Sequence, residues 1–123
     1  MKYIITLLTC ISIIMAAEGK IGGVTYFDYT NAEKTSAFTA VKMEGYLINT
    51  GSAVTATLPA GAVTGDSMFF VDVGRNFSTN NFTIDRNGMS INGVASSIVL
   101  TTTGESIGLV KTGSGWFTYI GYN

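Results

Sequence analysis

Histidine is absent from this 123-residue chain, cysteine occurs only as Cys10, and proline occurs only as Pro59. Without histidine, the chain lacks the base of a Ser-His-Asp or Cys-His nucleophile system. It also lacks the imidazole ligand of a Cys/His zinc site. A single cysteine excludes a disulfide within the chain. We therefore expect no cofactor and no enzyme of these classes.

Charged residues are also scarce. They make up 12% of the chain, with seven basic and eight acidic residues spread singly, and the net charge is −1. Nucleic-acid binding relies on clustered Lys and Arg that neutralise phosphates. The sequence therefore predicts no nucleic-acid partner. A hydrophobic content of 46% is also too high for a disordered chain.

Residues 3–17 are uncharged and mostly apolar. The segment is shorter than the roughly 20 residues of a membrane span. Lys2 before it and small residues ahead of Glu18 are typical of a secretory signal peptide or anchor. The alternative is a retained docking helix, because apolar residues recur at heptad a and d spacing. These heptad positions are Ile4, Leu7, Ile11 and Ile14. Membrane contact is expected only if the segment acts as an anchor.

Beyond this segment, short apolar stretches alternate with glycine-rich turns. In residues 54–58 the apolar positions alternate with threonine, which indicates a half-buried strand. Residues 68–73 are apolar on both faces, which predicts a central strand. Asn87-Gly88 predicts a tight type I′ turn. The expected strands are residues 24–29, 38–42, 46–49, 54–58, 68–73, 82–85, 98–102, 107–111 and 116–120.

This spacing of strands and turns predicts an all-β fold. We expect a β-sandwich or jelly-roll-like domain of about eight short antiparallel strands over residues 21–123. Residues 1–20 form the apolar N-terminal segment that precedes it.

Polar residues near the strand ends are candidates for structural roles. Asp66 follows a glycine and is expected to accept backbone N–H groups in a turn. Asn81, or its neighbour Asn80, is expected to cap backbone groups where a loop enters a strand. The candidate structural polar residues are Asp66, Asp72, Asn81 and Arg86.

Asp72 lies within an apolar stretch, so a buried carboxylate there needs a partner. Arg75 and Arg86 are the nearest candidates in the sequence. Asp72 and Asp85 also form the best carboxylate pair for glycoside hydrolysis, since both are expected on adjacent strands. We favour the structural interpretation, in which each caps a turn or pairs with arginine, and we assign no catalytic or metal-binding residue.

Aromatic residues give a second set of candidates. One interpretation is that these candidates, together with Phe27, Tyr29 and Tyr122, provide a sugar-stacking surface. The alternative, which we favour, is that they belong to the core and to a subunit interface. The candidate ligand or interface aromatics are Tyr26, Phe77, Trp116 and Tyr119.

A longer pattern of strand and turn residues runs through residues 45–119. It consists of Gly45-Tyr46-Leu47-Ile48-Asn49-Thr50, Val54 to Leu58-Pro59, Gly65-Asp66, Phe70-Val71-Asp72, Phe77, Asn80-Asn81-Phe82-Thr83-Ile84, Arg86-Asn87-Gly88, Ile91-Asn92-Gly93 and Gly115-Trp116-Phe117. This pattern is similar to a module that recurs in structural proteins of tailed phages, cyanophages especially.

The resemblance implies a structural protein of the virion, with a tail-fibre, neck, appendage or head-decoration role. It implies assembly with other virion proteins and a homo-oligomer, with a trimer favoured. The alternative, which the signal-like start favours, is a secreted or surface-anchored bacterial adhesion or carbohydrate-binding module whose partner is a cell-surface carbohydrate.

Overall fold

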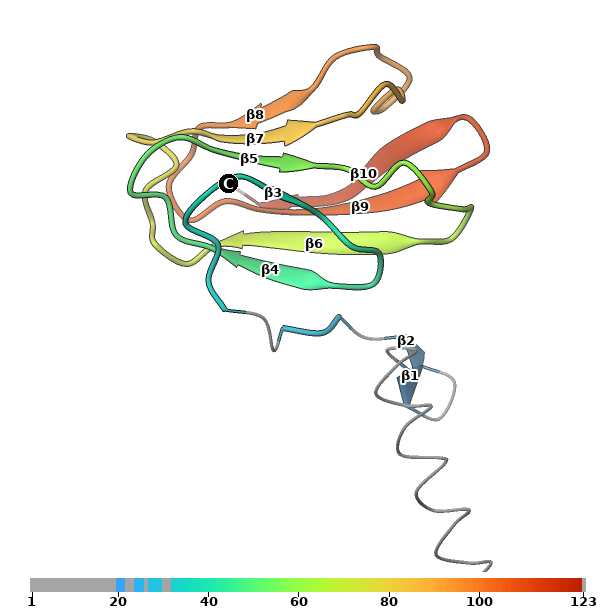
Figure 1. Cartoon of the computed structure of the whole chain (residues 1–123), viewed down its shortest axis with the longest axis horizontal. Helices are drawn as coiled ribbons and strands as arrows, with labels where there is room; N and C mark the ends of the chain where they lie inside the picture. Colours follow the sequence, from blue (N-terminus) through green and yellow to red (C-terminus); the bar gives the residue numbers. More distant parts are fainter. Residues whose placement is uncertain (1–19, 22–23, 26, 30–31, 123) are drawn as a thin grey trace, which may run out of the picture.

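The computed structural model describes residues 20–21, 24–25, 27–29 and 32–122, and these residues form strands and loops without a helix (Figure 1). The all-β prediction is confirmed for this part of the chain. The predicted apolar segment of residues 1–20 lies outside the described residues, apart from Lys20. A short pair, β1 (Lys20–Ile21) with β2 (Val24–Thr25), precedes two larger sheets.

Eight strands form two four-stranded sheets. Sheet 1 has the order β10 (Gly115–Tyr122), β9 (Ser106–Thr112), β6 (Ser67–Asp72) and β4 (Gly45–Ile48). Sheet 2 has the order β3 (Phe38–Thr39), β5 (Val54–Thr57), β7 (Phe82–Asp85) and β8 (Ile98–Leu100). Figure 1 shows β8, β7 and β5 above β6 and β4.

Both sheets are mixed, so the expectation of antiparallel strands was wrong. β4 runs parallel to β6, and β5 runs parallel to both β3 and β7. The pairings of β6 with β9, β9 with β10, and β7 with β8 are antiparallel. This mixture also differs from the antiparallel strands of a jelly roll.

The path of the chain explains the parallel pairings. From β3 to β7 the chain changes sheet after every strand. Parallel neighbours need a crossover, which in most proteins is a helix. Here a strand of the opposite sheet makes that crossover, because the chain reverses twice before it returns to the first sheet.

The open edge of β4 is covered by the chain that precedes β3. The backbone N–H of Lys34 donates to the carbonyl of Leu47 at 2.8 Å. Two isolated parallel bridges, Asp28 with Glu44 and Lys34 with Ile48, mark this contact. Covering an edge strand protects it from pairing with other chains. It also holds the chain around Tyr29 beside sheet 1.

A row of aromatic rings fills the core between the sheets. Neighbouring centroids along the row lie 4.8, 5.5, 5.4 and 5.2 Å apart. In order, the rings are Phe38, Tyr46, Phe70, Phe82 and Phe77. Phe70 of sheet 1 meets Phe82 of sheet 2, so this contact joins the two layers. A fully buried side chain of this size contributes about 1.5–3 kcal/mol.

β6 is the predicted central strand, since it lies between β4 and β9. Its buried positions are Met68, Phe70 and Asp72, and they alternate with half-buried positions such as Phe69. One side of the strand therefore faces the core, and the other faces away from sheet 2.

The predicted tight turn at Asn87-Gly88 is confirmed. Both residues have positive φ, 47° and 83°, and the Met89 N–H donates to the Arg86 carbonyl at 3.1 Å. The chain after this turn does not pair with β7. Residues 86–97 instead form an excursion, after which β8 returns beside β7.

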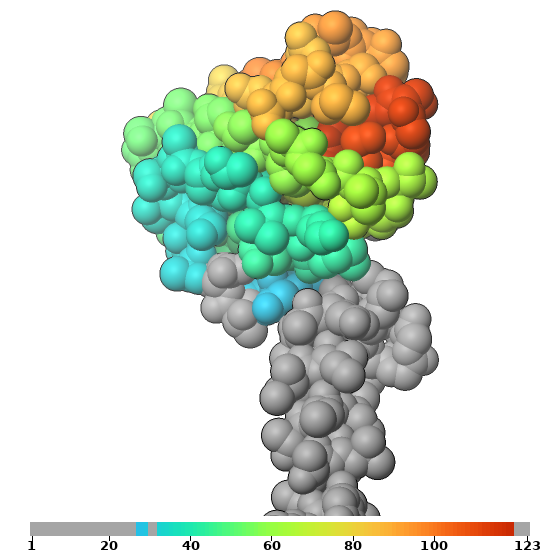
Figure 2. All heavy atoms as spheres, turned by 45° about the vertical axis from the view of Figure 1, so that its right-hand side comes forward, coloured from blue at the N-terminus to red at the C-terminus, as the bar shows by residue number. Residues whose placement is uncertain are grey.

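The excursion covers the edge of β10. The Asn92 N–H donates to the Trp116 carbonyl at 2.8 Å, and Asn92 Oδ1 accepts the Thr118 N–H at 2.9 Å. Figure 2 shows the excursion in yellow to orange beside the C-terminal strand in red.

Candidate functional site

Asp72 ends β6 with its carboxylate buried. The carboxylate accepts three backbone N–H groups, which satisfy it without a cation. The donors are Asn76 at 3.1 Å, Phe77 at 3.3 Å and Gly104 at 2.9 Å. The expectation that Arg75 or Arg86 pairs with Asp72 was therefore wrong. Backbone groups brought in by two loops take that place.

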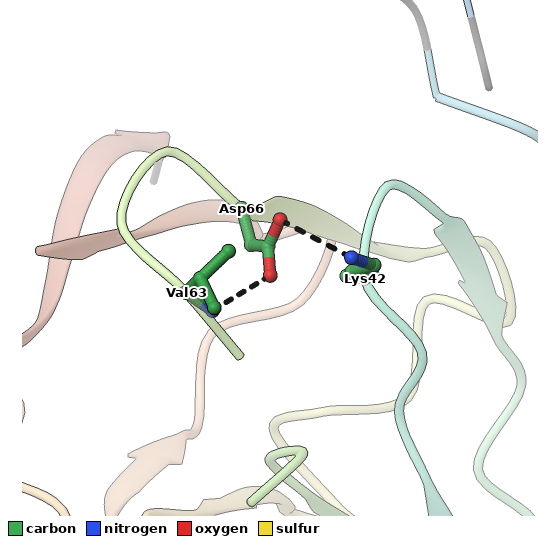
Figure 3. A network of polar contacts seen from close by, with 3 residues as sticks. All are labelled: Lys42, Val63 and Asp66. Carbon is green, nitrogen blue, oxygen red and sulfur yellow. Dashed lines mark hydrogen bonds and ion pairs between the residues drawn. The ribbon is translucent and has the colours of Figure 1, made fainter. Parts of the chain in front are cut away.

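Asp66 holds a turn at the start of β6. Its Oδ2 accepts the Val63 N–H at 2.8 Å, and its Oδ1 lies 3.8 Å from Lys42 Nζ (Figure 3). The Lys42 side chain is 58% exposed, so this ion pair contributes little. The role of Asp66 is to bond backbone, as expected from the sequence.

Two further polar side chains, those of Asn80 and Arg86, contact backbone. Asn80 Nδ2 donates to the Thr50 carbonyl at 3.1 Å, whereas the side chain of Asn81 is exposed. Of the two asparagines, Asn80 therefore joins its loop to the end of sheet 1. Arg86 Nη1 donates to the Met89 carbonyl of its own turn at 3.0 Å.

The carboxylate pair proposed for hydrolysis does not lie on adjacent strands. Asp72 belongs to sheet 1 and Asp85 to sheet 2. Asp85 accepts the Asn87 N–H at 2.8 Å within its turn. Among the described residues, no three His, Cys, Asp or Glu side chains gather where they would hold a metal ion.

The aromatic candidates separate into core and surface. Phe77 and Trp116 are fully buried, whereas Tyr119 is 44% exposed. Tyr26 lies outside the described residues. Of the four aromatic candidates, Tyr119 is the one available to a ligand in the described part of the chain.

Tyr119 lies on the outer face of sheet 1, the side turned away from sheet 2. None of the strand positions described on this face carries a charge. The positions are Gly45 and Leu47 of β4, Ser67, Phe69 and Val71 of β6, Ser106, Gly108, Val110 and Thr112 of β9, and Gly115 and Phe117 of β10. The face is thus apolar with isolated hydroxyl groups.

Two tyrosine rings lie against glycines of this face. A Cβ on Gly45 would overlap the Tyr29 ring, and a Cβ on Gly108 would overlap the Tyr119 ring. Even the third-nearest ring atoms would be only 2.7 and 2.8 Å away. Three neighbouring ring atoms meet each Cβ position, so each ring lies with its face against the sheet. Glycine is required at both positions, because it leaves the room that the rings occupy.

Neighbouring groups fix both rings. The Phe27 and Tyr29 rings are T-shaped to each other, with centroids 6.4 Å apart, and Phe27 packs against Phe69 at 5.9 Å. Tyr119 lies at a β-bulge in β10, which redirects its side chain, and its hydroxyl hydrogen-bonds with Ser67 Oγ at 3.2 Å. Gly45, Phe69 and Gly108 are aligned across β4, β6 and β9, so the two glycines lie two strand spacings apart, roughly 10 Å.

Tyr119 contributes to the electrostatic environment of Tyr29. Burial raises the pKa of Tyr29 above its usual value of 10.0, and negative charge on the Tyr119 hydroxyl raises that pKa further. Tyr29 is therefore neutral near pH 7. Tyr29 is 39% exposed and Tyr119 is 44% exposed, so part of each side chain remains accessible.

Sequence reasoning named the tyrosines but missed the glycines beneath them. Gly108 interrupts an apolar strand, and a glycine inside a strand is a known mark of close approach by another group. That signal was present in the sequence. The partner of each glycine was not predictable, because Tyr29 and Tyr119 reach them from other segments.

No helix of the described residues is long and apolar enough to cross a membrane. No protein-family model matches the chain, and no curated protein matches it in sequence.

Proposed function

We propose that this protein is a structural component of a tailed-phage particle, such as a fibre, decoration or appendage protein. The observation that carries the proposal is the coincidence of the phage-like pattern with the ordered fold. The pattern begins at Gly45, the first residue of β4, and ends within β10. We interpret the two-layered β domain as a sandwich that functions through its shape and its assembly with other subunits.

The polar residues of the pattern support assembly over catalysis. Asp66 and Asp72 direct their carboxylates at backbone N–H groups, and Asn87 and Asn92 form turns with positive φ. These roles are architectural. A pattern made of such residues maintains a fold rather than a reaction centre.

The proposal includes a homo-oligomer, with a trimer favoured, and contacts with other virion proteins. Analytical ultracentrifugation of the full chain tests the first part: a trimer mass supports it, and a monomer at micromolar concentration contradicts it. Negative-stain images of particles labelled with a specific antibody test the second. Labels at a fixed place on the particle support the particle role, and unlabelled particles contradict it.

A second candidate is a secreted or surface-anchored adhesion or carbohydrate-binding module. The observation that favours it is the pair of exposed tyrosine rings on an uncharged sheet face. Mass spectrometry of the native N-terminus separates the candidates. A chain that retains Met1 or Lys2 favours the particle, and a chain that begins near Glu18 favours secretion.

A further inference from the structure

We propose that Tyr29 and Tyr119 form a stacking platform for an uncharged, extended glycan chain on the outer face of sheet 1. The inference rests on the second candidate function and names its ligand class. It does not depend on the particle role.

The two tyrosine rings are presented on the surface of the sheet. Each ring lies with one face against a glycine, so its plane runs roughly parallel to the sheet and its other face is turned away from the backbone. The side chains are 39% and 44% exposed. The C–H face of a pyranose ring stacks on such an aromatic face, whose quadrupole is negative.

Neighbouring side chains hold the platform rigid. Phe27 and Phe69 hold Tyr29, and Ser67 holds the Tyr119 hydroxyl. Side chains that are fixed before binding lose little conformational entropy when a ligand arrives. Gly45 and Gly108 add to this rigidity, because each lets its ring lie directly on the backbone.

The spacing between the two tyrosine rings suits an extended chain. The glycines beneath the rings are two strands apart, roughly 10 Å. An extended chain of a few pyranose rings reaches from one tyrosine to the other. A glycan that coils tightly presents its rings in different directions and would contact one tyrosine at a time.

The chemistry of the surrounding sheet face favours a neutral ligand. The strand positions described on this face carry no charged side chain, which disfavours nucleic acids and acidic glycans. The purely apolar residues of this sheet face, such as Leu47 and Phe69, are half-buried. The exposed rings carry hydroxyl groups, and Ser67 adds another at the platform edge. A neutral ligand rich in hydroxyls fits this surface better than a second apolar protein face.

The test is a glycan array probed with the full chain. The array carries cellohexaose, xylohexaose and chitohexaose as neutral extended chains, maltohexaose as a coiled neutral chain, and sulfated and sialylated glycans as acidic ones. We expect signal on the extended neutral glycans. No signal on them, or signal on acidic glycans alone, overturns the proposal. Such a failure leaves the particle and secretion tests unaffected, since they measure location.

Variants then locate the site. Tyr29→Ala and Tyr119→Ala are expected to weaken binding about tenfold, the effect of losing one ring contact. Tyr29→Phe and Tyr119→Phe keep the ring and are expected to stay within about threefold of the parent chain. Val99→Ala, an exposed position in sheet 2, is the matched control. Unchanged affinity in both alanine variants overturns the proposal.

A measurement on the unmutated chain guards against variants that fail to fold. In ¹H–¹⁵N NMR spectra, the extended glycan that binds is expected to shift the amides of Gly45 and Gly108 and to leave that of Val99 in place. Shifts confined to sheet 2 contradict the site. The proposal is also contradicted if sedimentation shows a dimer of the parent chain that Tyr29→Ala and Tyr119→Ala convert to a monomer. That result assigns the face to a second copy of the chain.

Discussion

Asp72 and Gly104 are 32 residues apart in the sequence, yet Asp72 Oδ2 accepts the Gly104 N–H at 2.9 Å. The same carboxylate accepts the N–H groups of Asn76 and Phe77 from the loop that follows β6. One buried side chain thus ties the end of a central strand to two loops. A carboxylate with three such partners is a point where a single substitution acts on several segments at once.

Asp72→Asn is expected to lower the free energy of unfolding by about 3 kcal/mol, because an amide NH₂ would face backbone donors that have no other acceptor. Urea unfolding followed by circular dichroism measures this. Asp85→Asn is the matched control, since Asp85 accepts one N–H in a solvent-exposed turn, and its cost is expected to be below about 1 kcal/mol. Equal costs for the two substitutions would contradict the role given to Asp72.

Gly108→Ala is expected to displace the Tyr119 ring and to lower stability by about 1–2 kcal/mol. In a chain that already carries Tyr119→Ala, the same substitution should cost almost nothing, because the ring that it strikes is gone. Unfolding free energies of the four chains form a double-mutant cycle. Gly51→Ala, where a Cβ meets nothing within 4 Å, is the control. Additive costs in the cycle would mean that Tyr119 does not lie on Gly108.

Thr50→Val is expected to raise stability by about 1 kcal/mol. Thr50 is fully buried, and its Oγ1 has no hydrogen-bond partner among the described residues, so a methyl group of similar shape removes an unsatisfied polar atom. Thr55→Val, at a half-buried position of β5, should stay within about 0.5 kcal/mol of the parent. Thermal unfolding compares the two. A clear loss of stability from Thr50→Val would indicate that a buried water satisfies the hydroxyl.

Stability is expected to fall as the pH rises above about 10. Burial raises the pKa of Tyr46 well above its usual value of 10.0, and its bond to Glu44 raises that pKa further, against the lowering effect of the Val41 N–H. The folded chain therefore keeps this proton where the unfolded chain has lost it. Unfolding is then favoured by about 1 kcal/mol per pH unit in this range.

Urea unfolding of the parent chain and of Tyr46→Phe between pH 8 and roughly pH 11.5 checks this. The variant loses two hydrogen bonds and should be less stable at pH 8, yet its stability should fall less steeply with pH. Parallel pH profiles for the two chains would assign the alkaline sensitivity to other groups.

Local sequence signals predicted most of the elements. The alternation around Val54 and Ala56 and the Asn87-Gly88 pair each report a conformation that neighbouring residues determine. The parallel pairings were not predictable in this way. Alternation tells which face of a strand is buried, but it does not tell which of two sheets the next strand enters.

The candidate site was predictable only in part for the same reason. Tyr119 was named from its residue type, but its seat on Gly108 depends on the register of β10 against β9 and on the bulge beside it. Asp72 was expected to be satisfied, and it is, yet its partners are backbone groups. Backbone donors are present at nearly every residue, so the sequence does not distinguish the loop that supplies them.

Quantitative mass spectrometry of purified particles tests the central proposal most directly. Particles are purified from cultures that express the gene, and peptides from residues 45–119 are counted against the major capsid protein. A structural component should be present at a fixed number of copies per particle through successive density gradients, in a multiple of three if the trimer holds. A chain that is absent from the particles, or whose copy number falls with each gradient, would contradict the account.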